Sequence, residues 1–151
     1  MTLDPRNAIV ALFTDGLISA STEDGTKYVG IMLYEDNPTR MSKRDWAGVI
    51  ILEQVPNATI VTISIGGKVI NEMVTILANM WVDKKPGMLN PDVFVKAVLD
   101  AFQNAIIDHH TDIDTDTKFI QVTSIQTLPS DSPEVMRRAI TLSAQGYRIR
   151  P

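Results

Sequence analysis

The feature that most constrains the fold is a Gly-Gly pair between two apolar runs in ATIVTISIGGKVINEMVTILANMWVD, residues 58–83. Gly66 and Gly67 readily adopt the positive φ angles of a tight β-turn. The run after this pair also fits helical spacing, but its β-branched residues and the preceding turn favour a strand. The segment therefore predicts a long β-hairpin whose second strand has one apolar face and one mixed face.

The most regular helical pattern is NPDVFVKAVLDAFQNAIIDHH, residues 90–110. Asn90 is a suitable N-cap, Pro91 suits the first helical position, and Asp92 favours the positive end of the helix dipole. Apolar residues cover much of the girth, so this helix is expected to lie across a sheet.

A second helix is predicted at the start of the chain, in LDPRNAIVALFTDGLIS, residues 3–19. Asp4 is its expected N-cap, and Pro5 would occupy the first turn, where its missing N–H is not needed. Apolar residues then recur at the spacing of one helical face. Gly16 weakens the last turn, so the end of this helix is not fixed by the pattern.

Strand patterns account for most of the remaining chain. They occur in residues 27–35, 48–55, 118–128 and 135–150, and the polar, basic segment Asp36–Trp46 is expected to be an exposed loop. The order predicts an α+β fold: a mostly antiparallel sheet with two helices packed on one face and the long β-hairpin. No linker or repeat divides the chain, so residues 1–151 are expected to form a single domain.

Composition excludes several functional classes. The 151 residues contain no cysteine, which rules out disulfide scaffolds, thiolate metal sites and cysteine nucleophiles. A net charge of −4 argues against duplex nucleic acid as the main partner. The sequence shows neither a signal peptide nor a run of the roughly 18 apolar residues needed to span a bilayer. A soluble intracellular protein is therefore expected.

The segment DHHTDIDTD, residues 108–116, is the strongest candidate for metal chemistry. Its alternating aspartates resemble the start of an EF-hand loop, but Thr117 stands where that loop needs glycine and Thr123 where it needs glutamate. His109 and His110 are neighbours and would point about 100° apart on a helix. We therefore predict no catalytic, cofactor-binding or metal-binding residues, and a solvated helix end is the favoured interpretation.

Charge is unevenly distributed near the C-terminus. Four aspartates lie in residues 108–116, whereas Arg137, Arg138, Arg148 and Arg150 follow in the last strand. An ordinary solvated surface explains this pattern. Acidic and basic edges that meet between copies of the chain are the alternative, because a head-to-tail interface needs two unlike patches.

The chain as a whole resembles the tail terminator (tail completion) proteins of long-tailed phages and related archaeal tailed viruses. The similar parts are DPRNAIVALFTDG, YVGIMLYEDNP, GVIILEQV, the strands around IGGKV, PDVFVKAVLDAFQNAI and EVMRRAITLSAQGYRIR. The resemblance implies a small non-enzymatic protomer that forms a hexameric ring on the last ring of the tail tube. Such a ring stops tube polymerisation and offers a surface to the head connector.

The resemblance implies as partners further copies of this chain, the tail tube protein and the head–tail connector protein. It implies no membrane and no sequence-specific nucleic acid, and it places the protein in the tail or neck of the virion after assembly in the host cytoplasm. Three alternatives stay open: a metal-dependent hydrolase built on residues 108–116, another head–tail neck component, and a small binding module. The expected subunit or tube contacts are Lys68, Asn71, Asn79, Trp81, Arg137, Arg138, Arg148 and Arg150.

Overall fold

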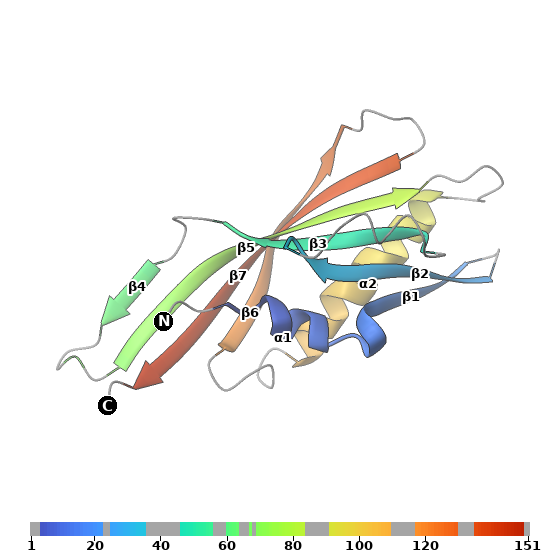
Figure 1. The fold of residues 1–151 in the computed structure, drawn as a ribbon. Coiled ribbons are helices and arrows are strands. Elements are labelled where there is room, and N and C mark those ends of the chain that lie inside the picture. Colours follow the sequence, from blue (N-terminus) through green and yellow to red (C-terminus); the bar gives the residue numbers. More distant parts are fainter. Residues whose placement is uncertain are drawn as a thin grey trace.

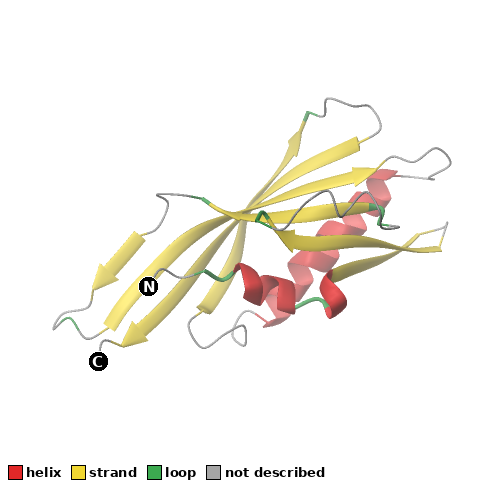
Figure 2. Ribbon diagram, in the orientation of Figure 1, coloured by secondary structure: helices red, strands yellow, loops and turns green. Residues whose placement is uncertain are grey.

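The described part of the chain folds as an α+β protein with two α-helices and a mostly antiparallel sheet, as the sequence predicts (Figures 1 and 2). The structure is a computed structural model. It describes residues 4–22, 25–35, 46–55, 60–63, 67, 69–83, 91–109, 117–129 and 135–149. The elements are α1 (Arg6–Ala11), the 3-10 turn η1 (Thr14–Gly16), β1 (Leu17–Thr22), β2 (Gly25–Leu33), β3 (Gly48–Gln54), β4 (Ile60–Ile63), β5 (Val69–Asp83), α2 (Pro91–His109), β6 (Thr117–Leu128) and β7 (Val135–Ile149).

The described strands form one seven-stranded sheet in the order β1-β2-β3-β5-β7-β6, with β4 beside β5. All pairs are antiparallel except β2 and β3, which run parallel. On one edge of β5, β3 pairs with residues 76–82 and β4 pairs with residues 70–73. The other edge of β5 pairs with β7 over its whole length.

The strand interpretation of residues 69–83 is confirmed. Val74, Ile76, Ala78, Met80 and Val82 are almost fully buried, and the residues between them are half-exposed. This period of two is that of a strand with one face in the core. Gly67 has a φ of 67°, as the predicted turn requires, but Gly66 and Lys68 lie outside the described residues.

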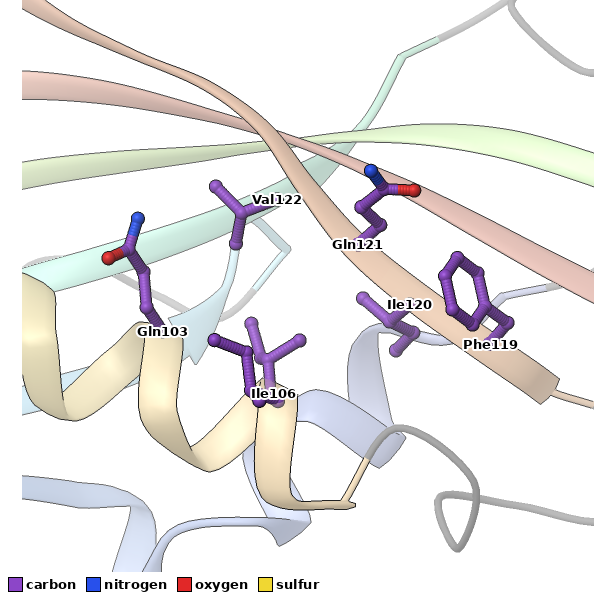
Figure 3. Close-up of a pocket in the computed structure, with 7 residues that line it drawn as sticks. Gln103, Ile106, Phe119, Ile120, Gln121 and Val122 are labelled. Carbon is purple, nitrogen blue, oxygen red and sulfur yellow. The ribbon is translucent and has the colours of Figure 1, made fainter.

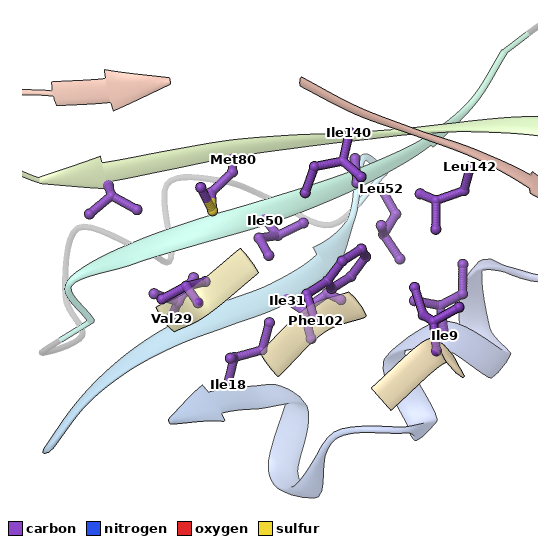
Figure 4. Packing of buried hydrophobic residues seen from close by; sticks show 14 of the residues in the cluster. Ile9, Ile18, Val29, Ile31, Ile50, Leu52, Met80, Phe102, Ile140 and Leu142 are labelled. Carbon is purple, nitrogen blue, oxygen red and sulfur yellow. The ribbon is translucent and has the colours of Figure 1, made fainter. Parts of the chain in front are cut away.

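Both helices pack on the same face of the sheet and share its apolar core. In Figure 4, Ile9 of α1 and Phe102 of α2 lie beside residues of the central strands, such as Ile50 and Leu142. Phe102 is fully buried and stacks on Phe13, with 5.9 Å between the ring centroids. The buried residues of α2 form one broad stripe along the helix, and this stripe packs against the sheet as the sequence pattern predicts.

The predicted first helix is too long. Only Arg6–Ala11 is α-helical, and the residues that follow the 3-10 turn form strand β1, which the sequence analysis missed. Asp15 and Gly16 have φ values of 56° and 65°, a conformation that ends a right-handed helix. Pro5 flanks the helix instead of occupying its first turn.

No helix in the described ranges is both long and apolar enough to cross a membrane.

Candidate functional site

One face of the sheet carries neither of the described α-helices, and we call it the outer face. It is defined by Ile51 of β3, Leu77, Asn79 and Trp81 of β5, and Arg137 of β7 with the residues level with them. Their neighbours along each strand, such as Ile50 and Met80, are buried under the helices. Because side chains alternate across a strand, these five residues point away from the helices.

Trp81 and Arg137 form the most specific contact on this face. They are cross-strand partners on β5 and β7, and the guanidinium carbon of Arg137 lies 5.2 Å from the centroid of the Trp81 ring. A cation over the face of an aromatic ring is attracted by the ring quadrupole. Both side chains are half-exposed. The contact therefore holds them in place on the surface, where a partner could still reach them.

A small apolar layer covers one end of the outer face, although no described helix lies over it. Val49 is only 2% exposed there and lies between Gly30 and Trp81, its partners on the two neighbouring strands. Trp46 lies over Gly30, since a Cβ at that glycine would come within 2.2 Å of the Trp46 ring. Trp46 is therefore partly buried against the sheet, and the expectation that it ends an exposed loop is wrong.

A glycine within a strand pattern is the sequence feature that indicates this apolar layer. Glycine inside a strand often marks a close approach by another group. Gly30 lies in the middle of β2, and Trp46 lies two residues before the start of β3, the strand beside it. Residues 36–45 of the predicted basic loop lie outside the described residues.

The sheet also has a projecting arm, formed by β4 with residues 69–73 of β5 and 145–149 of β7. In Figure 1 these segments extend beyond the two helices. On the arm, Gln145 Nε2 donates a hydrogen bond to Asn71 Oδ1 at 3.0 Å, and Met73 is 38% exposed. This side-chain hydrogen bond joins β5 to β7 at a place that α1 and α2 do not reach.

The structure brings together three of the predicted contact residues. Asn79, Trp81 and Arg137 lie on neighbouring levels of β5 and β7 and share the outer face, whereas Asn71 lies farther along β5, on the arm. Arg138 does not join them, because it is level with the buried Met80 and so lies toward the opposite face. Its Nη1 donates a hydrogen bond to the Arg137 carbonyl oxygen at 2.9 Å.

The remaining predicted contact residues are placed less completely. The backbone of Arg148 pairs with that of Ile70. Arg148 is an even number of residues from Arg138 along β7, so it occupies a position of the same face as Arg138. Lys68 and Arg150 lie outside the described residues.

A separate charged cluster joins the start of α1 to the end of β2. Arg6 Nε and Nη2 donate to the two carboxylate oxygens of Asp4 at 2.9 and 3.0 Å, and Nη1 donates to both oxygens of Glu35 at 2.7 Å. These hydrogen bonds to Arg6 lower the pKa values of Asp4 and Glu35, and those from Arg6 to both carboxylates raise the pKa of Arg6. Each guanidinium nitrogen of Arg6 donates to a carboxylate of the same chain, so we interpret the cluster as structural.

The predicted acidic and histidine cluster falls largely outside the described part of the chain, which ends at His109 and resumes at Thr117. Within the described ranges, no three histidine or acidic side chains are grouped so that they could hold a metal ion. The sequence matches no protein-family model and no curated protein. The function is therefore argued from the outer face and the arm.

Proposed function

We propose that this chain is a structural assembly protein of a tailed virus, a tail terminator or another head–tail neck component. Copies of the chain would form a ring, a hexamer by the resemblance, that caps the tail tube and ends its polymerisation. The same ring would join the tube to the head connector. In this proposal the chain acts by fitting against its partners and breaks no covalent bond.

The observation that carries the proposal is the outer face of the sheet. An antiparallel sheet can leave one face in water, but such a face is then mostly polar. Here Ile51, Leu77 and Trp81 occupy positions on three successive levels of adjacent strands and are only half-buried. Polar residues such as Glu53 and Thr141 surround them on the same face. A few large side chains, with a tryptophan and an arginine among them, inside a polar rim are typical of a protein interface.

The arm supports the proposal independently. Its strands extend past the helices, so the arm lies away from the compact core (Figure 1). The arm contains β4 and the start of β5, which belong to the segment predicted as a long hairpin, and Asn71 in it is one of the expected subunit or tube contacts. A ring needs two unlike surfaces on each copy, and the arm and the compact part of the molecule offer two such surfaces.

Native mass spectrometry of the purified chain tests the proposal. The wild type should give a closed oligomer of several copies at high micromolar concentration, and this oligomer should bind isolated tail tubes. Asn79→Arg should yield monomers, because it places a new charge between Ile51 and Ala139 on the outer face. Lys96→Glu, on the exposed side of α2, is the control and should assemble like the wild type.

A wild type that stays monomeric and ignores tail tubes would contradict the proposal. So would an Asn79→Arg protein that assembles and binds tubes normally, because the outer face would then lie outside every contact.

A further inference from the structure

A groove runs between the second half of α2 and the first half of β6, away from the outer face (Figure 3). Its volume is about 450 Å³. Figure 3 shows Gln103 and Ile106 rising from α2 and Ile120 and Val122 extending from β6. The lining residues are Gln103, Ile106, Ile107, Phe119, Ile120, Gln121 and Val122.

The groove is apolar and carries no charge. Five of its seven lining residues are apolar, and the other two are the neutral Gln103 and Gln121. Ile107 is 63% exposed and Phe119 is 40% exposed, so large apolar side chains face solvent along it. An occupant should therefore be uncharged and should contribute apolar side chains.

The wall that β6 contributes includes the edge of the strand as well as its side chains. Residues 119–122 all line the groove, although consecutive side chains of a strand point to opposite faces. β6 is the last strand of the sheet and pairs with β7 alone among the described strands. A strand edge beside an apolar groove is a site for an added extended segment, which pairs by its backbone and places alternate side chains in the groove.

The arm supplies a segment of matching chemistry. β4 has the sequence IVTI, and it contains three β-branched apolar residues, one threonine and no charge. Among the described strands it pairs only with β5, so it is also an edge strand. Its four residues equal the number that line the groove on β6. The other edge strand without charges, β1, has the sequence LISAST, whose small polar residues would fill an apolar groove poorly.

We propose that the groove between α2 and β6 receives β4 of a second copy of this chain, which adds to the edge of β6. The contact joins two different surfaces and is therefore head-to-tail, the kind of contact from which closed rings are built. This inference rests on the proposed function and specifies one contact within it.

Variants that block one side of the contact at a time provide the test. Ile107→Lys places a charge in the groove, at a residue already exposed on α2. Val93→Lys is its matched control, because Val93 is 64% exposed on the same helix and does not line the groove. The double variant Ile60→Lys/Ile63→Lys blocks β4 and leaves the groove intact.

The groove variant and the β4 variant should each be monomeric by native mass spectrometry, whereas Val93→Lys should assemble like the wild type. Mixing the two blocked variants should give a dimer with one copy of each. The intact β4 of the groove variant then binds the intact groove of the β4 variant. The altered groove and the altered β4 are left over, and neither can bind a third copy. Circular dichroism and thermal unfolding of each variant establish that it is folded before mixing.

Two results would overturn the inference. Ile107→Lys that assembles normally would show that the groove is not a contact, while the ring of the proposed function would stand. A β4 variant that forms dimers with itself would show that groove meets groove. If the wild type itself is monomeric, both the ring and this contact are excluded.

Discussion

The guanidinium group of Arg137 lies over the ring of Trp81, 5.2 Å from its centroid, and joins β7 to β5 on the face of the sheet opposite the two described α-helices. The two residues are 56 positions apart in the sequence (137 − 81) but are direct partners across the sheet. The contact therefore forms only once the central strands pair in this register.

We expect Trp81 and Arg137 to stabilise each other by about 0.5–1 kcal/mol, the usual range for an exposed cation–π contact. A double-mutant cycle of Trp81→Leu and Arg137→Ala, followed by urea denaturation of monomeric protein, measures this coupling. Arg137→Lys should retain part of it, since the charge remains. Purely additive single effects would show that the two side chains do not interact in solution.

Gly30→Ala should destabilise the fold by about 1–3 kcal/mol, because its Cβ would overlap the Trp46 ring. Trp46→Ala removes the obstructing ring, so Gly30→Ala should cost much less in that background. Chemical denaturation followed by circular dichroism compares the four proteins. Equal costs of Gly30→Ala with and without Trp46 would contradict this packing.

Gly48→Ala should be at least as damaging, but it should not be relieved by Trp46→Ala. A Cβ at Gly48 would meet the carbonyl oxygen of Trp81 at 2.3 Å, which is backbone and cannot rotate away. Relief requires β3 and β5 to separate, so we expect a loss of about 2 kcal/mol or more. Thermal unfolding of the single and double variants distinguishes this clash from the one at Gly30.

The Arg6 cluster should make stability depend on pH in the acid range. The pKa values of Asp4 and Glu35 are lowered by their hydrogen bonds to Arg6, so the unfolded chain binds more protons than the folded chain near their ordinary values of roughly 4. The two carboxylates contribute fully to stability above their ordinary pKa values. This contribution is lost as the pH falls through their lowered pKa values in the folded protein.

The variant Arg6→Gln tests this dependence. It should cost about 1 kcal/mol near neutral pH, a small amount because both carboxylates are partly exposed. The difference from the wild type in urea denaturation should shrink between about pH 6 and about pH 3. A difference that stays constant over this range would mean that Arg6 stabilises the fold through its packing and not through its charge.

Local patterns were enough to predict most elements of the fold. The caps and apolar stripe of residues 91–109 specify a helix in any context, and the β-branched run of residues 69–83 specifies a strand once a turn precedes it. Strand β1 was missed because its sequence continues the helical spacing of α1. Its identity depends on the backbone reversal at Asp15 and Gly16 and on pairing with β2.

The candidate contact surfaces were only partly predictable. Alternation along β5 puts Asn79 and Trp81 on one face, but the sequence alone selected Arg138 as well as Arg137, because it does not show the register of β7 against β5. Alternation cannot say which face the helices will cover or which strand will end the sheet. The uncovered outer face and the groove beside β6 follow from long-range strand order, which is set by packing between segments distant in the sequence.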